Sequence, residues 1–158
     1  MKLLHLADLH LGKRVYEFSM LEDQKYILQQ ILDMLEIEQI DGILFAGDIY
    51  DKTVPSAEAV QLFDDFLSKI VEKQVSVFLI SGNHDSAERL SFGSKIFSKS
   101  KVHFASGYHG KVERITVEDE YGPVHIYLLP FVKPIHVKRA FPEQEEEIHS
   151  YQDAMKVV

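Results

Sequence analysis

The sequence predicts an α/β fold built from a strand–helix–strand–helix–strand series. Three observations predict it: short, nearly continuous apolar runs recur along the chain, amphipathic helical stretches lie between them, and a polar segment directly follows each run. Apolar strands of this kind are typical of a parallel sheet covered on both faces, with right-handed crossovers between strands. In such sheets ligands bind at the carboxyl ends of the strands.

The first apolar run, Lys2–Ala7, predicts a buried strand that ends at Asp8. A helix should follow, because Ser19 and Glu22 have the spacing of a capping box and apolar side chains then recur at helical spacing to about Ile37.

The second run, Gly42–Ala46, predicts a strand, and the next helix should begin at Pro55 and Ser56 and continue to about Val71. The third run, Val75–Ile80, predicts another strand. A shorter helical stretch through Leu90 follows it, with Ile96 and Phe97 as candidates for its extension.

After Lys101 the pattern changes to short alternating segments, which predict antiparallel strands over 102–105, 111–118 and 124–129. Gly122 and Pro123 predict the turn between the last two. The tail from residue 130 contains three prolines and the acidic run 145–147, and it ends in a predicted helix over 148–158. Neither a repeat nor a linker divides the chain, so we expect one domain, 1–158.

Composition limits the class of protein. The 158 residues are 46% apolar and 27% charged, which excludes a disordered chain and indicates a globular one. The chain has no cysteine, which excludes disulfides, thiolate metal ligands and a cysteine nucleophile, and fits a reducing compartment. The longest apolar run, 126–132, is far shorter than the roughly 20 residues that span a bilayer. Asp8 and His10 also interrupt any signal-peptide core, so we expect a cytoplasmic protein with no membrane partner.

The net charge is −8, from 17 basic and 25 acidic side chains, whereas DNA-binding proteins are usually basic. An acidic balance is expected of a carboxylate-rich metal site that lacks its cations. Charge therefore neither supports nor excludes a phosphate-containing substrate.

Polar residues follow all three of the first predicted strands: Asp8 and His10, then Asp48 and Asp51, then Asn83, His84 and Asp85. Neighbouring parallel strands lie about 4.8 Å apart, so these side chains can meet around one or two metal ions. Carboxylate oxygen, imidazole nitrogen and amide oxygen suit Mn²⁺, Fe or Zn. Each group alone is also explained by a turn or a helix N-cap. Their order at equivalent strand ends favours a metal site.

These residues resemble a known family. Asp-x-His, Gly-Asp-x-x-Asp and Gly-Asn-His-Asp, in this order, resemble the calcineurin-like metallophosphoesterases. The strings HLADLHLGK (5–13), FAGDIYDKTVPS (45–56) and SGNHDSAERL (81–90) resemble the bacterial SbcD nuclease subunits of the meiotic recombination 11 nuclease family. The resemblance covers residues 1 to about 135. It implies an α/β/β/α sandwich, of which this chain is an N-terminal part, incomplete at its C-terminus and with sheet or helix surface left exposed.

The resemblance also implies roles. Asp8 and His10 would bind a first metal, Asp48 would bridge two metals, and Asn83 would bind the second. His84 would not bind metal but would stabilise the transition state and help to protonate the leaving oxygen.

Asp51 and Asp85 would orient an imidazole or a water molecule. Asp51 stands where archaeal and eukaryotic relatives usually have histidine, which puts its role in question. Lys13 and Arg14 could contact DNA phosphates by charge, and a solvated pair is the simpler alternative.

The family completes its metal sites with three histidines from Gly-His and Gly-His-x-His motifs, which this chain lacks. His109 precedes Gly110 in the wrong order. We expect His5 to be a buried core histidine and His125 to be a core or face residue of a strand. The second metal site should therefore be incomplete, while Asp8, His10 and Asp48 could still hold one ion.

The function implied is that of an Mn²⁺-dependent DNA exonuclease and endonuclease that hydrolyses phosphodiester bonds with two metal ions and works with an SbcC-type ATPase subunit in double-strand break repair. This chain alone should be inactive. The resemblance also implies a homodimer through the helices after Asp51 and Asp85, with Val60, Leu90, Ile96 and Phe97 as candidate contacts. Two alternatives stay open: a metallophosphoesterase acting on small phosphoesters, and a non-catalytic dimerisation or ATPase-docking module.

Overall fold

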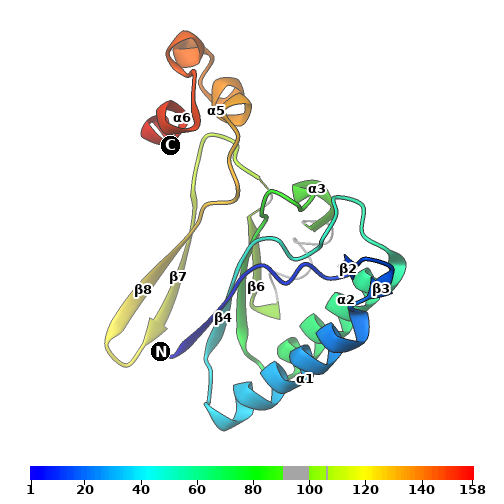
Figure 1. Cartoon of the computed structure of the whole chain (residues 1–158). Coiled ribbons are helices and arrows are strands. Elements are labelled where there is room, and N and C mark those ends of the chain that lie inside the picture. Colours follow the sequence, from blue (N-terminus) through cyan, green and yellow to red (C-terminus); the bar gives the residue numbers. More distant parts are fainter. Residues whose placement is uncertain (91–99, 106) are drawn as a thin grey trace.

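The computed structural model describes residues 1–90, 100–105 and 107–158, and its centre is a four-stranded parallel sheet (Figure 1). The register aligns Leu4, Ile43, Val77 and Val102 across the sheet. The predicted α/β class and its first three strands are confirmed. In their order across the sheet, the strands are β1 (Leu3–Leu6), β4 (Gly42–Ala46), β5 (Ser76–Ile80) and β6 (Val102–Ala105).

The prediction that 102–105 is an antiparallel strand is wrong, because β6 runs parallel to β5. The burial of β6 does not alternate: Val102 and Ala105 are buried and the two residues between them are half-buried. The order of apolar and polar residues indicates which side chains are buried, not the direction of the neighbouring strand.

Two helices, α1 (Leu21–Ile37) and α2 (Ala57–Glu72), pack side by side on one face of the sheet (Figure 1). Their apolar faces meet the side chains that the strands present on that side, and the main core lies between these two layers. Its fully or almost fully buried members include Leu28, Leu32, Phe66, Ile70, Ile43 and Phe45.

Only one of the two predicted helix starts is confirmed. Ser56 caps α2, and its hydroxyl accepts a hydrogen bond from the Ala59 amide at 3.3 Å. The capping box predicted at Ser19 is wrong: Ser19 belongs to strand β3 (Phe18–Ser19), which pairs with β2 (Arg14–Val15). Helix α1 instead begins after Met20, without a side-chain cap. Ser19 does not occupy the N-cap position, because its backbone pairs with Arg14 of β2.

The opposite face of the sheet is covered in part by an antiparallel hairpin of β7 (Glu113–Asp119) and β8 (Gly122–Leu128), as the sequence predicts. Apolar side chains of the hairpin pack against Phe78. The turn lies at residues 120 and 121 rather than at Gly122 and Pro123, because the register pairs Asp119 with Gly122. At this tip the Met1 ammonium group bonds Asp119 at 2.8 Å.

The hairpin leaves part of that sheet face open. Leu44 packs with the hairpin cluster, but His5, its neighbour in register on β1, is exposed, as is Ala46. The prediction of a buried His5 is therefore wrong, and the expected exposed sheet surface is present. His125 is a face residue, exposed and hydrogen-bonded to Thr116 at 3.0 Å.

The C-terminal segment forms a second, small cluster beyond the hairpin (Figure 1). It contains α5 (Pro134–Ala140), a 3₁₀ helix η2 (Pro142–Glu147) and α6 (Tyr151–Val157). The predicted final helix begins only after Ser150, whose hydroxyl forms a capping box with Asp153, while Ile148 is fully buried before it. The prolines at 134 and 142 lie at helix starts, where a missing amide hydrogen costs nothing.

A short helix, α3 (Ala87–Leu90), follows β5. Of the candidate dimer contacts, Val60 is 44% exposed on α2, whereas Leu90 is buried in the main core and so is not a surface residue. Ile96 and Phe97 lie outside the described residues. Within the described ranges, every helix is too short or too polar to span a membrane.

Candidate metal centre

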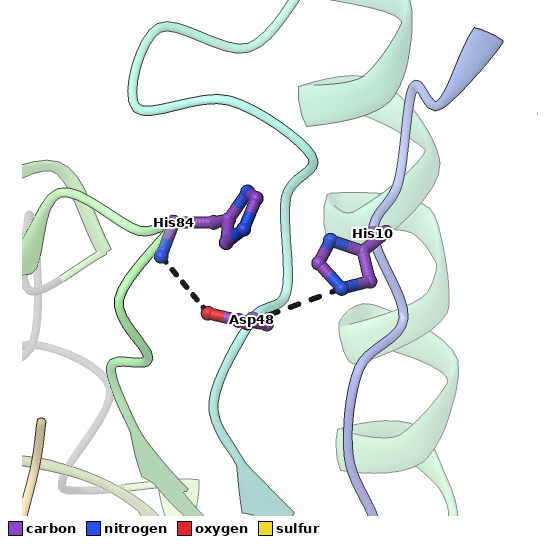
Figure 2. Close-up of side chains that lie close together, drawn as sticks. All are labelled: His10, Asp48 and His84. Atoms are coloured by element: carbon purple, nitrogen blue, oxygen red, sulfur yellow. Dashed lines mark hydrogen bonds and ion pairs between the residues drawn. The ribbon is translucent and has the colours of Figure 1, made fainter.

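Loops that follow β1, β4 and β5 bring His10, Asp48 and His84 together at the carboxyl edge of the sheet (Figure 2). One potential ligand atom from each of the three lies within 4.8 Å of the others. The three residues are 38 and 36 positions apart in sequence, and the parallel order of the strands brings them to one point.

The first two loops hydrogen-bond to each other beyond the ends of their strands. The amide of Asp8 donates to the Gly47 carbonyl at 3.2 Å, and the amide of His10 donates to the Asp48 carbonyl at 2.9 Å. Asp8, His10 and Asp48 all have left-handed backbone conformations, with φ of 57°, 44° and 52°. Aspartate and histidine adopt this conformation more readily than most residues, although it still costs free energy.

Gly82 permits the third loop to touch the second. A Cβ atom at Gly82 would lie 2.0 Å from Asp48 Oδ1 and 2.4 Å from the Asp48 amide nitrogen. His84, two residues later, donates its backbone amide to the same Oδ1 at 3.0 Å (Figure 2). The Asp48 carboxylate is therefore fixed on one side by the backbone of the loop after β5.

Asp85 joins the second and third loops through its carboxylate. This residue is 8% exposed and accepts hydrogen bonds from the amides of Ile49, Tyr50 and Gly82 at 3.2, 3.0 and 2.9 Å. The resemblance implied that Asp85 orients an imidazole or a water molecule. In the structure both of its oxygens bind backbone amides, so its contribution is to hold two loops in place.

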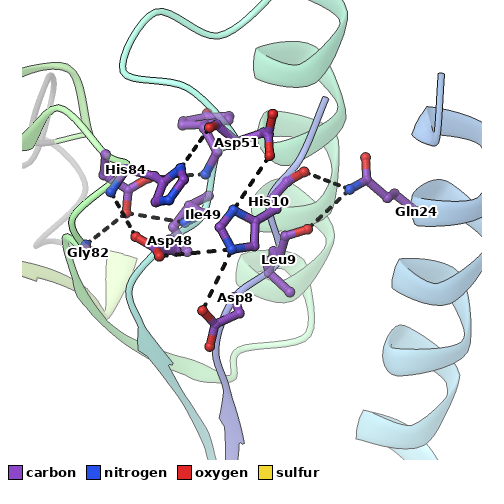
Figure 3. Close-up of polar contacts among 11 residues, drawn as sticks. Asp8, Leu9, His10, Gln24, Asp48, Ile49, Asp51, Gly82 and His84 are labelled. Carbon is purple, nitrogen blue, oxygen red and sulfur yellow. Dashed lines mark hydrogen bonds and ion pairs between the residues drawn. The ribbon is translucent and has the colours of Figure 1, made fainter. Parts of the chain in front are cut away.

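Figure 3 shows the His10 imidazole among three carboxylates, which it approaches at ion-pair distances that are too long for hydrogen bonds. Its Nε2 is 3.7 Å from Asp8 Oδ1 and 3.9 Å from Asp48 Oδ2, and its Nδ1 is 3.8 Å from Asp51 Oδ1. Nδ1 is buried and has no hydrogen-bond partner among the described residues. Nε2, which faces one oxygen each of Asp8 and Asp48, fits a cation held between these groups, whereas Nδ1 faces Asp51 on the other side of the ring.

His84 packs edge to face against His10, with ring centroids 4.8 Å apart and an interplanar angle of 84°. Its Nδ1 donates to the Asp51 carbonyl at 2.9 Å. This hydrogen bond raises the pKa of His84 above its ordinary value of 6.5, and the negative charges of Asp48, Asp51 and Asp85 raise it further. Because its Nδ1 is bonded to a carbonyl, the ring has Nε2 available to exchange a proton.

The remaining predicted residues surround this cluster. Asn83 is exposed between Gly82 and His84, and Asp8 is also exposed. Lys13 is exposed, and Arg14, in β2, donates to the Glu17 carbonyl and lies 4.0 Å from the Glu17 carboxylate. A groove of about 470 Å³ runs beside the cluster and is lined in part by Arg14, Asp51 and Lys52.

Gln24 is part of the site, and the sequence did not predict it. It lies in α1, and its side-chain amide bonds the loop that carries His10 (Figure 3). A glutamine in an amphipathic helix resembles any other polar residue of the solvent face, so nothing in the sequence pattern distinguishes it.

Comparison with known proteins identifies relatives of the chain. Residues 1–152 match the family model described as calcineurin-like phosphoesterase. The SbcD subunit of the nuclease SbcCD from Staphylococcus epidermidis is 38% identical over 156 residues, which are 98% of this chain and 40% of that protein. The SbcD subunit from Staphylococcus saprophyticus is 36% identical over 150 residues, 94% of this chain and 39% of that protein. The chain thus spans about 40% of the length of these curated relatives.

Proposed function

Because the chain belongs to the calcineurin-like phosphoesterase family, we propose that it is the metal-binding part of an SbcD-type DNA exonuclease and endonuclease. The observation that carries the proposal is the meeting of His10, Asp48 and His84 at the carboxyl edge of the sheet, where His10 Nε2 lies 3.7 Å from Asp8 Oδ1 and 3.9 Å from Asp48 Oδ2. Phosphodiester hydrolysis requires charge neutralisation and proton donation at one point, and this cluster has groups for both.

The proposed ligands of a first Mn²⁺ ion are Asp8, His10 and Asp48. A bound divalent cation would supply electrophilic activation of the phosphate and neutralise its charge. The His84 backbone amide would keep the Asp48 carboxylate in position, and the Asp85 carboxylate would hold the two loops together. The His84 imidazole would donate a proton to the leaving oxygen, and its place beside His10 and Asp48 supports that role.

For a second ion the chain offers Asp48, shared with the first site, and the Asn83 amide oxygen. We propose that this second site is incomplete in the chain, because the histidines that the resemblance implies are absent from it. One ion should therefore bind more tightly than the other, and the chain alone should not turn over DNA.

The proposed partners are DNA and an SbcC-type ATPase subunit, and the names of the relatives support the pairing. The proposed phosphate contacts are Lys13 and Arg14, both exposed next to the loop that carries His10. The groove that Arg14 lines also contains Lys52, Asp51 and Glu58, so its lining has no net charge. A homodimer through α2, where Val60 is exposed, belongs to the same proposal, as does a cytoplasmic location.

Calorimetric titration of the chain with Mn²⁺ tests the metal site. The wild-type chain should show saturable binding that Asp48→Ala abolishes. The matched control is Asp64→Ala, which removes an exposed carboxylate from α2 and should leave binding unchanged. Absence of binding to the wild-type chain would contradict a metal site within it.

Activity is tested on a chain extended to the length of the relatives. His84→Gln should abolish DNA hydrolysis while Mn²⁺ still binds, and Asp8→Asn should weaken Mn²⁺ binding. Hydrolysis of small phosphomonoesters without DNA hydrolysis would favour the small-phosphoester alternative. Unchanged properties in both variants would favour a docking module.

A further inference from the structure

We infer that Gln24 is a positioning residue of the metal centre, an inference that rests on the function proposed above. Its side-chain amide holds the loop 8–12, which carries Asp8 and His10, in the conformation that directs the His10 imidazole toward Asp48 and His84.

Gln24 uses both ends of its amide on this loop. Its Nε2 donates to the carbonyls of Leu9 and His10 at 3.1 and 2.8 Å (Figure 3). Its Oε1 accepts from the Gly12 amide at 3.0 Å. Both amide hydrogens and one lone pair of the oxygen are therefore engaged. The side chain is half-buried, so water competes for these bonds only in part.

The backbone of loop 8–12 forms hydrogen bonds on two sides, to the loop after β4 and to α1. Its amides at Asp8, His10 and Leu11 donate to the loop after β4. The Leu11 carbonyl also bonds the loop after β4, because it accepts from the Asp51 amide at 3.1 Å. On the other side, Gln24 donates to the Leu9 carbonyl and to the His10 carbonyl, which it shares with the Lys13 amide. The loop is thereby held between the sheet edge and α1.

The His10 ring has no hydrogen bond within the described residues to set its orientation. Metal-binding histidines usually donate their second ring nitrogen to a carboxylate or carbonyl, which fixes the ring. Here Nδ1 lacks such a partner, and Asp51 Oδ1 is 3.8 Å away. The direction of the ring then depends on its contact with the His84 ring and on the backbone that carries it, and Gln24 bonds that backbone at His10 itself.

The test compares Gln24→Ala and Gln24→Glu with wild type in the 158-residue chain. Gln24→Glu keeps the volume and the acceptor for Gly12 but presents oxygen to the carbonyls of Leu9 and His10. The control is Gln29→Ala, which removes an exposed glutamine of the same helix whose Nε2 donates to Asp33 at 3.0 Å. Mn²⁺ affinity, the nuclear Overhauser contact between the His10 and His84 rings in metal-free protein, and metal-free thermal unfolding are measured for each.

Both Gln24 variants should bind Mn²⁺ about 10–100-fold more weakly and lose the contact between the rings, with Gln29→Ala unchanged. A lower unfolding temperature with wild-type Mn²⁺ affinity and an intact ring contact would show a merely structural role and overturn the inference. If the wild-type chain binds no Mn²⁺, the proposed function fails. The inference about Gln24 is then tested by the contact between the His10 and His84 rings alone, which both Gln24 variants should lose. If Gln24→Ala does not fold, Gln24→Glu decides, because its side chain has the same size.

Discussion

Gly82 and Asp48 approach so closely that a methyl group on Gly82 would lie 2.0 Å from the Asp48 carboxylate. Two polypeptide segments from neighbouring strands thus meet through a residue without a side chain. Oδ1 of this carboxylate lies against the backbone of the loop after β5, while Oδ2 faces the His10 imidazole, so the position of the carboxylate depends on the size of residue 82.

Gly82→Ala should therefore displace Asp48. We expect Mn²⁺ affinity to fall about 10-fold or more, and the free energy of unfolding to fall by about 1–3 kcal/mol as the loops are forced apart. Calorimetry and urea denaturation measure the two effects. Gly107→Ala is the control: φ there is +100°, which imposes backbone strain, but the nearest atom to its Cβ is 3.6 Å away, so only stability should fall. Normal Mn²⁺ binding by Gly82→Ala would contradict the prediction.

Asp85→Asn should destabilise the fold. Asparagine has one acceptor oxygen in place of two, and its amide group would face a backbone N–H, so at least one of the three amides now bonded to Asp85 would lose its partner. The expected loss is about 2–4 kcal/mol, because buried amides without partners and lost bonds to a charged acceptor are both costly. Urea denaturation at neutral pH measures it, and the exposed Asp64→Asn should change stability by less than about 0.5 kcal/mol. Equal stability of the two variants would refute the role given to Asp85.

His103 should make stability fall as pH is lowered. Its ring stacks on Phe78, with centroids 5.3 Å apart, and burial lowers its pKa below the ordinary 6.5, with Glu113 opposing the shift. Between the folded and the ordinary pKa the unfolded chain binds more protons, so this contribution is complete above 6.5 and is lost as pH falls toward the folded pKa.

Denaturation at a series of pH values from about 7.5 to 5.5 measures this effect. Wild type should lose more stability over that range than His103→Gln, which cannot titrate there. Identical pH dependence of the two proteins would exclude the effect, and NMR titration of the ring gives an independent value of the folded pKa.

Ser56→Ala should cost about 1 kcal/mol, because the Ser56 hydroxyl caps α2. Ser19→Ala should cost less than about 0.5 kcal/mol, because α1 begins without a side-chain cap. Chemical denaturation of the two variants measures the difference. Equal losses would mean that Ser19 does cap α1 in solution.

The three N-terminal strands could be predicted because each is an apolar run that ends abruptly in polar residues. That same ending predicted where Asp48, His10 and His84 would meet. The direction of β6 could not be predicted, because a four-residue strand with two half-buried positions has the same pattern in either direction. The exposure of His5 depends on how far the hairpin extends over the sheet, which no local pattern encodes.

Ser19 and Gln24 show a different limit of prediction from the sequence. The capping-box spacing at Ser19 is correct locally, but pairing of β3 with β2 commits that backbone to a strand. Gln24 bonds a loop that is 12 to 15 residues earlier in the chain, and that partnership exists only after α1 has packed on the sheet. Both outcomes depend on tertiary contacts rather than on local propensity.

Asp8, His10 and Asp48 all have a left-handed backbone, a conformation that the fold requires at these positions whatever side chains the metal chemistry requires. Glycine adopts this conformation without steric cost, so the sheet and its crossovers would tolerate glycine at Asp8 and His10, whose side chains lie near other charged side chains rather than against backbone groups. Asp48 differs, because its Oδ1 accepts the His84 amide and so joins two loops. The side chains at positions 8 and 10 could therefore be replaced to suit a different cation without redesigning the core.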